Sequence, residues 1–265
     1  MINNFNFPEG VKWSLNYTSG PDFFSDDFKF TNADNLFYNY TGSVVKYLDI
    51  SNATSARSMF YYCDNLITIP QLDTSNVTKM DSMFYHCSSL LTIPQLNTSK
   101  VTNMYNMFYN CDKLITIPQL DTSNVTNMSS MFSDCGNLIT IPQLNTSNVT
   151  NISYMFRGCS RLVSVPLLDC GKVTSTYNIL NPSYYGDHIY LTDMGGFKNL
   201  KVDLDIQKAP NLTVQSLMNV INNLYDFRAN GDSTTTRTLQ IGTTNLNKLT
   251  DDQKAVATNK GWSLT

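Results

Sequence analysis

The sequence predicts an α/β solenoid whose coils are each 24 residues long and consist of a short strand, a turn and a short helix. Two observations carry this prediction. Five similar units run from about Leu48 to Leu167 without an insertion, and the apolar positions change their period within each unit. One such coil cannot bury its own apolar stripe, so identical coils are expected to stack and cover one another.

The repeat keeps its register at several positions at once. A Met-Phe pair, a Cys, a Leu and a Pro each recur every 24 residues. The recurring residues are Met59, Met83, Met107, Met131 and Met155 with the Phe after each, Cys63, Cys87, Cys111, Cys135 and Cys159, Leu66, Leu90, Leu114, Leu138 and Leu162, and Pro70, Pro94, Pro118, Pro142 and Pro166.

The second unit illustrates the expected secondary structure. Apolar residues from Val77 to Cys87 recur at helical spacing, which predicts a short helix there. Residues 73–78 supply Asx-turn and N-cap side chains just before this helix. Residues 90–93 form a short apolar run that ends at Pro94, which predicts a short strand.

The two ends of the array are expected to be caps. Residues 1–47 are rich in Phe, Tyr and Trp and are predicted to cap the first coil or to dock onto a partner. The solenoid proper is placed at residues 48–180, where Pro182 ends the match. Residues 181–265 are predicted to form irregular strand and helix repeats that cover the C-terminal edge of the sheet.

Within the C-terminal part the pattern predicts particular elements. Residues 201–206 and 238–241 are expected as strands, and residues 212–224 as an amphipathic helix. A second helix is expected over residues 250–259, with Thr250 and Gln253 as a capping box and Gly261 as its C-terminal stop. Residues 262–264 would add a last short strand.

The charge of the chain excludes some classes of partner. Only 15% of the residues are charged and the net charge is -3, so attraction to phosphate backbones is weak and nucleic acid is not expected as a partner. No apolar run is long enough to span a membrane, so membrane insertion is not expected. The N-terminal residues show no secretory signal, so the protein is expected to leave its cell, if it does, by another route.

The units N-V-T-x-M-x-x-M-F-x-x-C-x-x-L-x-T-I-P resemble the BspA-type leucine-rich repeat, which is also described as a lipoprotein-associated repeat in mycoplasmas. The resemblance covers about residues 48–173, and residues 191–265 look like the part that often follows such repeats in proteins of gut bacteria and their phages. It implies a right-handed leucine-rich-repeat solenoid. It also implies a non-catalytic protein of a cell surface or a virion, which works by adhesion or recognition.

The recurring cysteine has four interpretations. Stacked coils place equivalent thiols about 5 Å apart in a row. A small buried thiol behind the Phe is the preferred interpretation. A disulfide would leave one of five thiols over, zinc needs converging ligands rather than a line, and catalysis needs a base that only His86 offers. No catalytic, metal or cofactor site is therefore predicted.

A ladder of Asp and Asn starts each unit. Its members are Asp49, Asp73, Asn97, Asp121, Asn145 and Asp169. From Asp73 on, carboxylates and amides alternate, which limits repulsion between stacked carboxylates while it keeps an oxygen for the turn. Calcium binding along this edge is the alternative.

A binding surface is expected where the repeats differ, at the two positions after Met-Phe. The candidate residues are Tyr61, Tyr62, Tyr85, His86, Tyr109, Asn110 and Arg157. Tyrosine offers a large and rigid contact area with a polar tip, which suits protein or carbohydrate contact. Solvated helix residues without a ligand are the alternative.

These observations predict a non-enzymatic structural or recognition protein without a cofactor. The preferred setting is a phage virion, as a tail or head fibre or decoration component that contacts the host surface. Its partners would be other virion proteins or a host surface protein or glycan, and a homo-oligomer is left open. The alternatives are an adhesin that binds host matrix or glycans, on the bacterial surface or secreted, and an intracellular scaffold.

Overall fold

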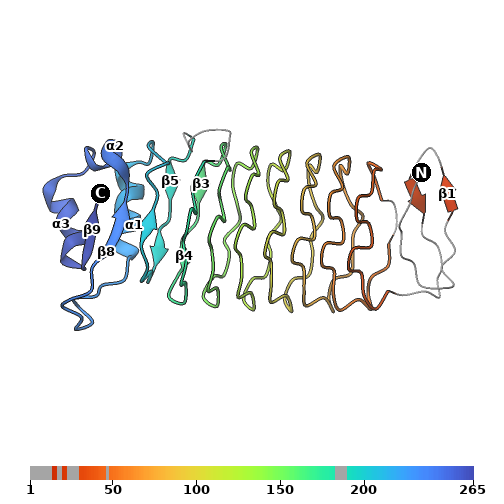
Figure 1. Cartoon of the computed structure of the whole chain (residues 1–265), viewed down its shortest axis with the longest axis horizontal. Helices are drawn as coiled ribbons and strands as arrows, with labels where there is room; N and C mark the ends of the chain where they lie inside the picture. The colour runs from red at the N-terminus through yellow and green to blue at the C-terminus, as the bar shows by residue number, and fades with distance from the viewer. Residues whose placement is uncertain (1–13, 17–19, 23–29, 46–47, 183–189) are drawn as a thin grey trace.

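The computed structural model is a row of coils that stand side by side along the long axis of the molecule, with the helical part at the C-terminal end (Figure 1). It describes residues 30–45, 48–182 and 190–265 in full, together with the backbone of β1 (Ser14–Asn16) and β2 (Gly20–Asp22). β1 and β2 pair antiparallel, with Ser14 opposite Asp22. Stacked coils are therefore the architecture of the repeats, and their right-handed sense stays a prediction.

A continuous row of parallel β-bridges joins the coils. It contains Ser55, Lys79, Asn103, Asn127, Asn151 and Ser175. Each bridge links two residues one repeat apart, so the 24-residue period of the sequence becomes the translation of the stack. The first coil of the row begins before Leu48, because Phe37 already donates its backbone N–H to Met59 at 2.7 Å.

The predicted helix in each repeat is wrong. Residues 80–87 form a run of tight turns in which Ser82 and His86 have φ of 57° and 60°. The same left-handed values recur at the equivalent positions of the other coils. We call this segment of each coil the turn run. An α-helix cannot form across residues that repeatedly leave the right-handed region.

Successive backbone N–H groups of the turn run alternate between two kinds of hydrogen-bond partner. The N–H groups of Ser82, Phe84 and His86 donate to carbonyl groups of the next coil, at 2.7 to 2.9 Å. The N–H groups between them, of Tyr85 and Cys87, fold back on carbonyls three residues earlier, at 3.1 and 3.2 Å. Half of the amides thus close local turns and half tie the coils together, so no donor remains for helical bonds.

The predicted strand in each repeat is also reduced. Residues 90–93 form no strand, and along this side of the coils the repeats keep isolated bridges such as Thr140 to Ser164. A two-residue strand, β3 (Ser164–Val165), appears only where the repeats end. The Pro of each unit follows directly and has no N–H to donate, so the pairing cannot extend.

The core is a set of parallel ladders, one for each recurring apolar position. The Met, Phe, Cys and Leu of every repeat are fully buried. The Phe rings stack between neighbouring coils with centroids 5.2 to 6.1 Å apart, from Phe37 to Phe156. The core positions follow the prediction, although the backbone that presents them does not.

The C-terminal part follows the predicted elements more closely. β4 (Leu168–Asp169) pairs with β6 (Phe197–Lys198), and β3 pairs with β5 (Asp193–Met194), so the stack continues past the regular repeats. β7 (Leu204–Asp205), β8 (Arg237–Gln240) and β9 (Trp262–Leu264) form a three-stranded parallel sheet.

Helices α1 (Val214–Asn223) and α3 (Asp251–Asn259) pack on each other, α1 against β5 and β6, and α3 against β9. Both hydrogen bonds of the predicted capping box join Thr250 and Gln253, at 2.9 and 3.2 Å. The short helix α2 (Gly242–Leu246) was not predicted. The boundaries after residues 47 and 180 stay a proposal, and most of the predicted N-terminal cap lies outside the described residues.

Candidate recognition surface

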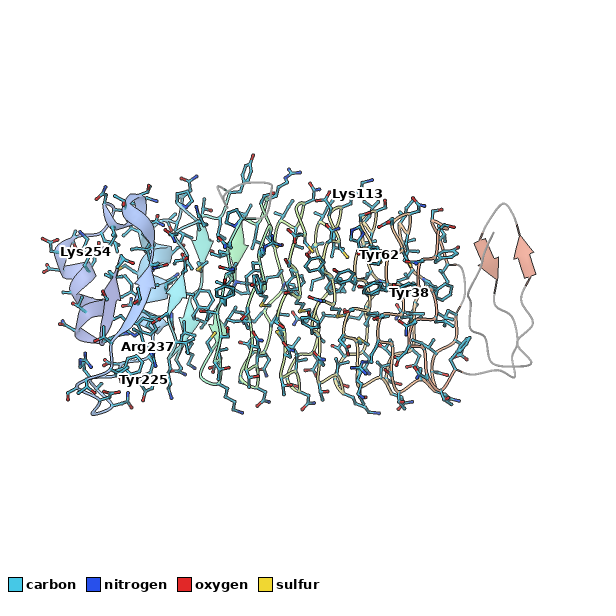
Figure 2. All side chains as sticks on the ribbon, viewed as in Figure 1. Tyr38, Tyr62, Lys113, Tyr225, Arg237 and Lys254 are labelled. Atoms are coloured by element: carbon cyan, nitrogen blue, oxygen red, sulfur yellow. The ribbon has the colours of Figure 1, made fainter. Side chains whose placement is uncertain are left out.

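Four tyrosines from successive coils lie on one another in a row. Tyr38, Tyr61, Tyr85 and Tyr109 have neighbouring ring centroids 5.1, 4.5 and 4.7 Å apart, with interplanar angles of 6° or 7°. We call these four residues the tyrosine strip. It occupies the turn runs in the N-terminal half of the row, where Figure 2 labels Tyr38 and Tyr62. The strip follows from the fold, because residues one repeat apart lie one coil apart.

A second aromatic row lies beside the strip. Tyr62 is 40% exposed, packs edge-on against Tyr61 and Tyr85, and stacks on His86 at 4.5 Å. The Nδ1 atom of His86 is 2.7 Å from an Asp64 oxygen. Both Tyr62 and His86 have left-handed backbone angles. These residues are held by ring and hydrogen-bond contacts, so little conformational entropy remains to be lost on binding.

The strip ends at a polar cluster. The next coil has Ser133 where the strip has tyrosine, and its neighbour Asp134 is buried. Arg157 donates from Nη1 to Asp134 Oδ2 at 2.8 Å, and Ser133 donates to the same oxygen at 3.1 Å. Burial and the negative charge of Asp134 raise the pKa of Tyr109. The predicted site residue Arg157 is therefore paired with Asp134 at the end of the strip, and its contact with a ligand stays a prediction.

The centre of the strip is uncharged at physiological pH. Burial, and then the neighbouring Tyr109 and Tyr61, raise the pKa of Tyr85 to about 12. The hydroxyl of Tyr85 is therefore protonated and can donate a hydrogen bond. The two inner rings, Tyr61 and Tyr85, have both faces covered by their neighbours in the strip, so only their positive edges are open to a partner.

The structure brings together five of the seven predicted site residues. Tyr61, Tyr62, Tyr85, His86 and Tyr109 form one continuous surface. Asn110 lies in the row of His86 and has the same left-handed φ, at 56°.

Two exposed tyrosines in or beside the strip were missed. Tyr38, at 47%, begins the strip, and Tyr105, at 42%, follows Arg57 and Asp81 in a neighbouring row. The signal for Tyr38 was its position 23 residues before Tyr61, which the sequence assigned to a cap.

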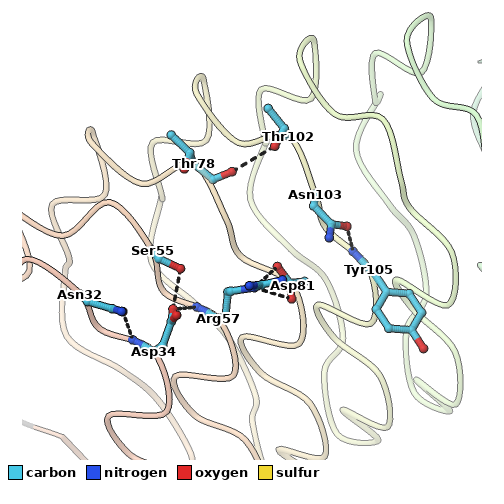
Figure 3. Close-up of polar contacts among 9 residues, drawn as sticks. All are labelled: Asn32, Asp34, Ser55, Arg57, Thr78, Asp81, Thr102, Asn103 and Tyr105. Atoms are coloured by element: carbon cyan, nitrogen blue, oxygen red, sulfur yellow. Dashed lines mark hydrogen bonds and ion pairs between the residues drawn. The ribbon is translucent and has the colours of Figure 1, made fainter.

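The row that contains Tyr105 is tied by polar contacts (Figure 3). Arg57 Nε lies 3.0 Å from both carboxylate oxygens of Asp81. Asp34 accepts from the hydroxyl of Ser55 and from the backbone N–H of Arg57. These contacts join consecutive coils, so they keep the spacing of the coils that carry the strip.

The cysteine ladder is structural. Each of the five repeat thiols is buried and points at the carbonyl of a Phe in the preceding coil, at 2.9 to 3.1 Å. Cys87, next to His86, donates to Phe60 O at 3.0 Å, and burial raises its pKa well above the ordinary value. A raised pKa disfavours the thiolate that nucleophilic or metal chemistry needs.

The Asp and Asn ladder closes turns. Asp73 Oδ1 accepts from the backbone N–H of Ser75 at 3.0 Å, and Asp121 accepts from Ser123 in the same way. This hydrogen bond lowers the pKa of Asp121. Nearby lies an open hollow of about 560 Å3, which Lys198 lines together with Asp169. In the part of the chain that the structure describes, no group of three or more His, Cys, Asp or Glu residues is placed to hold a metal.

The comparisons with known proteins identify the family. The model described as "Mycoplasma protein of unknown function, DUF285" matches residues 29–116 and 89–183, which together are more than half of the chain. The chain therefore belongs to this family, and the resemblance to BspA-type leucine-rich repeats is confirmed.

A crystal structure of a leucine-rich-repeat protein from T. pallidum is similar with a TM-score of 0.45 and 16% identity, over 84% of this chain and 86% of that chain. No curated protein matches the sequence. Within the described residues, no helix is long and apolar enough to cross a membrane.

Proposed function

We propose that this chain is a non-enzymatic recognition protein that binds its partner through the tyrosine strip. The observation that carries the proposal is the row of four stacked tyrosines on consecutive coils, with Tyr62 and His86 beside it. Tyrosine is enriched at the centres of interfaces because it buries a large area with few rotatable bonds. The buried thiols, with their raised pKa values, support a role without covalent chemistry.

The chemistry of the strip favours a protein partner over a sugar platform. Ring edges and protonated hydroxyls interact best with acceptors such as backbone carbonyls and carboxylates. A sugar ring that packs on an aromatic side chain needs an open ring face, and the central rings of the strip, Tyr61 and Tyr85, are stacked on both faces. We therefore propose that the strip contacts a protein surface rich in hydrogen-bond acceptors.

For the setting, we propose a phage virion, in which the chain is a tail or head fibre or decoration component that contacts the host surface. A straight stack of coils tied by repeated backbone hydrogen bonds supports this role, because it holds the strip in a fixed geometry (Figure 1). The alternative is a bacterial surface adhesin that binds host matrix or glycans. The family match supports this alternative, because the family is described from Mycoplasma, a cellular bacterium.

Mass spectrometry of purified virions separates the two settings. Phage particles are prepared from the bacterium that carries the gene, and washed cells of the same culture are treated with protease as a control. The virion proposal expects peptides of this chain in the particles at a constant ratio to the capsid protein. Peptides released from the cells, with none in the particles, would favour the adhesin instead.

A further inference from the structure

A second surface of the stack carries a row of exposed aliphatic side chains. Its members are Ile67, Leu91, Ile115, Ile139 and Val163, and we call them the aliphatic stripe. They are 38% to 48% exposed, although the Leu that precedes each one is fully buried. Each lies one repeat from the next, so the stripe runs along five coils without a polar interruption.

Backbone hydrogen bonds hold the stripe in a straight line. The N–H of Leu91 donates to Ile67 O at 3.1 Å, and the N–H of Val163 donates to Ile139 O at 2.9 Å. Neighbouring side chains are therefore about 5 Å apart, as in a parallel sheet. Scattered apolar residues are normal on a surface, whereas a contiguous row of this kind marks an interaction site.

The rows that flank the stripe decide which partner fits it. Two and three positions before each aliphatic residue, the first coil has Asp64 and Asn65 and the fifth has Ser160 and Arg161. The middle coil has Asp112 and Lys113, and the second and fourth coils have no charge at these positions. Along the stripe the charge therefore runs from negative, through a balanced centre, to positive.

These flanking side chains border the stripe in space. Lys113 lines the same open hollow of about 610 Å3 as Ile67 and Leu91. Arg161 donates to Asn137 Oδ1 at 3.0 Å, so it extends along its own row. Asp64 remains 52% exposed beside His86.

We propose that the aliphatic stripe is a homodimer interface, on which a second copy of this chain packs with its stack of coils running in the opposite direction. A two-fold axis through the middle coil places Ile115 of both copies at the centre. It brings Ile67 of one copy against Val163 of the other, and Leu91 against Ile139.

Charge complementarity supports this choice of partner. The same rotation turns the charge gradient around, so Asp64 of each copy faces Arg161 of the other. At the centre, the same rotation sets Asp112 near Asp112 and Lys113 near Lys113, so the charge complementarity comes from the contacts of Asp64 with Arg161 at the two ends. A parallel two-fold arrangement would instead carry the charged row of the second copy to the other side of the stripe, so Asp64 and Arg161 would have no opposite charge to face.

The size of the stripe sets the expected strength. Five coils at about 5 Å make a stripe roughly 25 Å long. Because the stripe is only one side chain wide, the area that it buries is small compared with the roughly 800 Å2 per partner of a standard interface. The dimer should therefore be reversible, with a mass in sedimentation that rises with concentration from 29.9 kDa toward twice that value. A mass that stays at 29.9 kDa at every concentration would overturn the proposal.

Two matched variants locate the interface. Ile115→Lys places two like charges together on the two-fold axis and should abolish the dimer. Val214→Lys adds the same charge at an aliphatic residue of similar exposure, 39%, in helix α1, and should leave the dimer unchanged. Circular dichroism of each variant verifies that it is folded. A dimer that survives Ile115→Lys would show that the stripe is not the interface.

A charge exchange tests the direction of packing. Arg161→Glu alone should lower the association constant about tenfold or more, because the new carboxylate faces Asp64 of the second copy. Adding Asp64→Lys to the same chain should restore the association, and Asp64→Lys alone should weaken it. If the double variant is as weak as the singles, the antiparallel arrangement is wrong. The stripe shares no residue with the tyrosine strip, and Ile115→Lys and Arg161→Glu leave the contact between Asp64 and His86 in place, so these two variants test the dimer separately from the proposed recognition function.

Discussion

At the scale of single residues, the left-handed backbone positions explain which residue types recur at two positions of each repeat. The two such positions in each turn run are Ser82 and His86 and their equivalents, with φ near 57° and 60°. At the second position the later coils have Asn110, Asp134 and Gly158, which are residue types that tolerate this region best. Pro182 falls at the same position one coil further on, and its ring fixes φ at a negative value. A further regular turn run is thereby excluded.

A glycine substitution tests this backbone conformation. Ser82→Gly should stabilise the protein by about 0.5 to 1 kcal/mol, because a side chain at positive φ is strained and glycine is not. Ser89→Gly is the matched control, since Ser89 has no positive φ, and it should lower the stability by a similar amount. Urea unfolding of both variants provides the measurement. Destabilisation of the same size in both would contradict the turn run.

The thiols give a second test at this scale. Burial raises the pKa of Cys87 and of Cys135, and each thiol donates to a carbonyl, so the folded protein should resist a thiol reagent near neutral pH. Cys87 should be labelled no faster than Cys111, and both should react only as fast as the protein unfolds. Mass spectrometry of the labelled peptides gives the two rates. Markedly faster labelling of Cys87 would indicate an accessible thiolate beside His86.

At the scale of elements, the sequence determined the register and the core but not the backbone between them. The buried positions from Val77 to Cys87 fit a helix and a run of turns equally well, because both bury a residue every three or four positions. The difference depends on hydrogen bonds to the next coil, which one repeat by itself does not reveal. The recurrence of Ser, Asn, Asp and Gly at the two left-handed positions was the available signal.

The C-terminal elements were more predictable because their signals are local. The capping box at Thr250 and the amphipathic stripe of α1 depend on residues within one helix. The missed helix α2 has five residues and begins at Gly242, where φ is 77°, so it has too few turns to show a period. Three of the four residues of the tyrosine strip could be predicted, because residues one repeat apart lie on adjacent coils. The contact of Arg157 with Asp134 could not be predicted, because the repeat spacing does not indicate it.

The end of helix α1 provides a prediction at this scale. Lys260 Nζ donates to the carbonyls of Asn222, Ile221 and Leu224, at 2.6, 3.2 and 3.5 Å. A cation at the C-terminus of a helix stabilises it, so Lys260→Met should lower the free energy of unfolding by about 1 to 2 kcal/mol. The control is Lys254 of α3, which is partly exposed and pairs with the fully exposed Asp251 at 3.6 Å. Lys254→Met should change the free energy of unfolding by less than about 0.5 kcal/mol. Equal effects would show that Lys260 does not secure this end.

At the scale of the whole molecule, the protein is a rod whose coils contact their neighbours and whose surfaces differ by row. One row carries the tyrosine strip, and another carries the aliphatic stripe. Because each coil repeats the last, small side-chain changes at one repeat position create a long, rigid surface without any change of fold. We therefore propose that recognition takes place at these surface rows, and that the buried ladders hold them straight.

The most direct test of recognition by the strip compares three variants in one binding assay. Fluorescently labelled wild-type protein, Tyr85→Ala, Tyr85→Phe and Tyr177→Ala are incubated with intact cells of the bacterium that carries the gene or that its phage infects. Tyr177 is the control, since it is 63% exposed and lies outside the strip. Thermal unfolding of each variant verifies that the stack is intact.

We expect Tyr85→Ala to weaken binding about tenfold or more, which corresponds to about 1.4 kcal/mol, because a central aromatic contact is lost. Tyr85→Phe should have a smaller effect, since it keeps the ring stacked and removes only the hydroxyl, and Tyr177→Ala should bind within about twofold of wild type. Saturable binding by folded Tyr85→Ala that equals wild type would contradict the central claim that the tyrosine strip is the recognition surface.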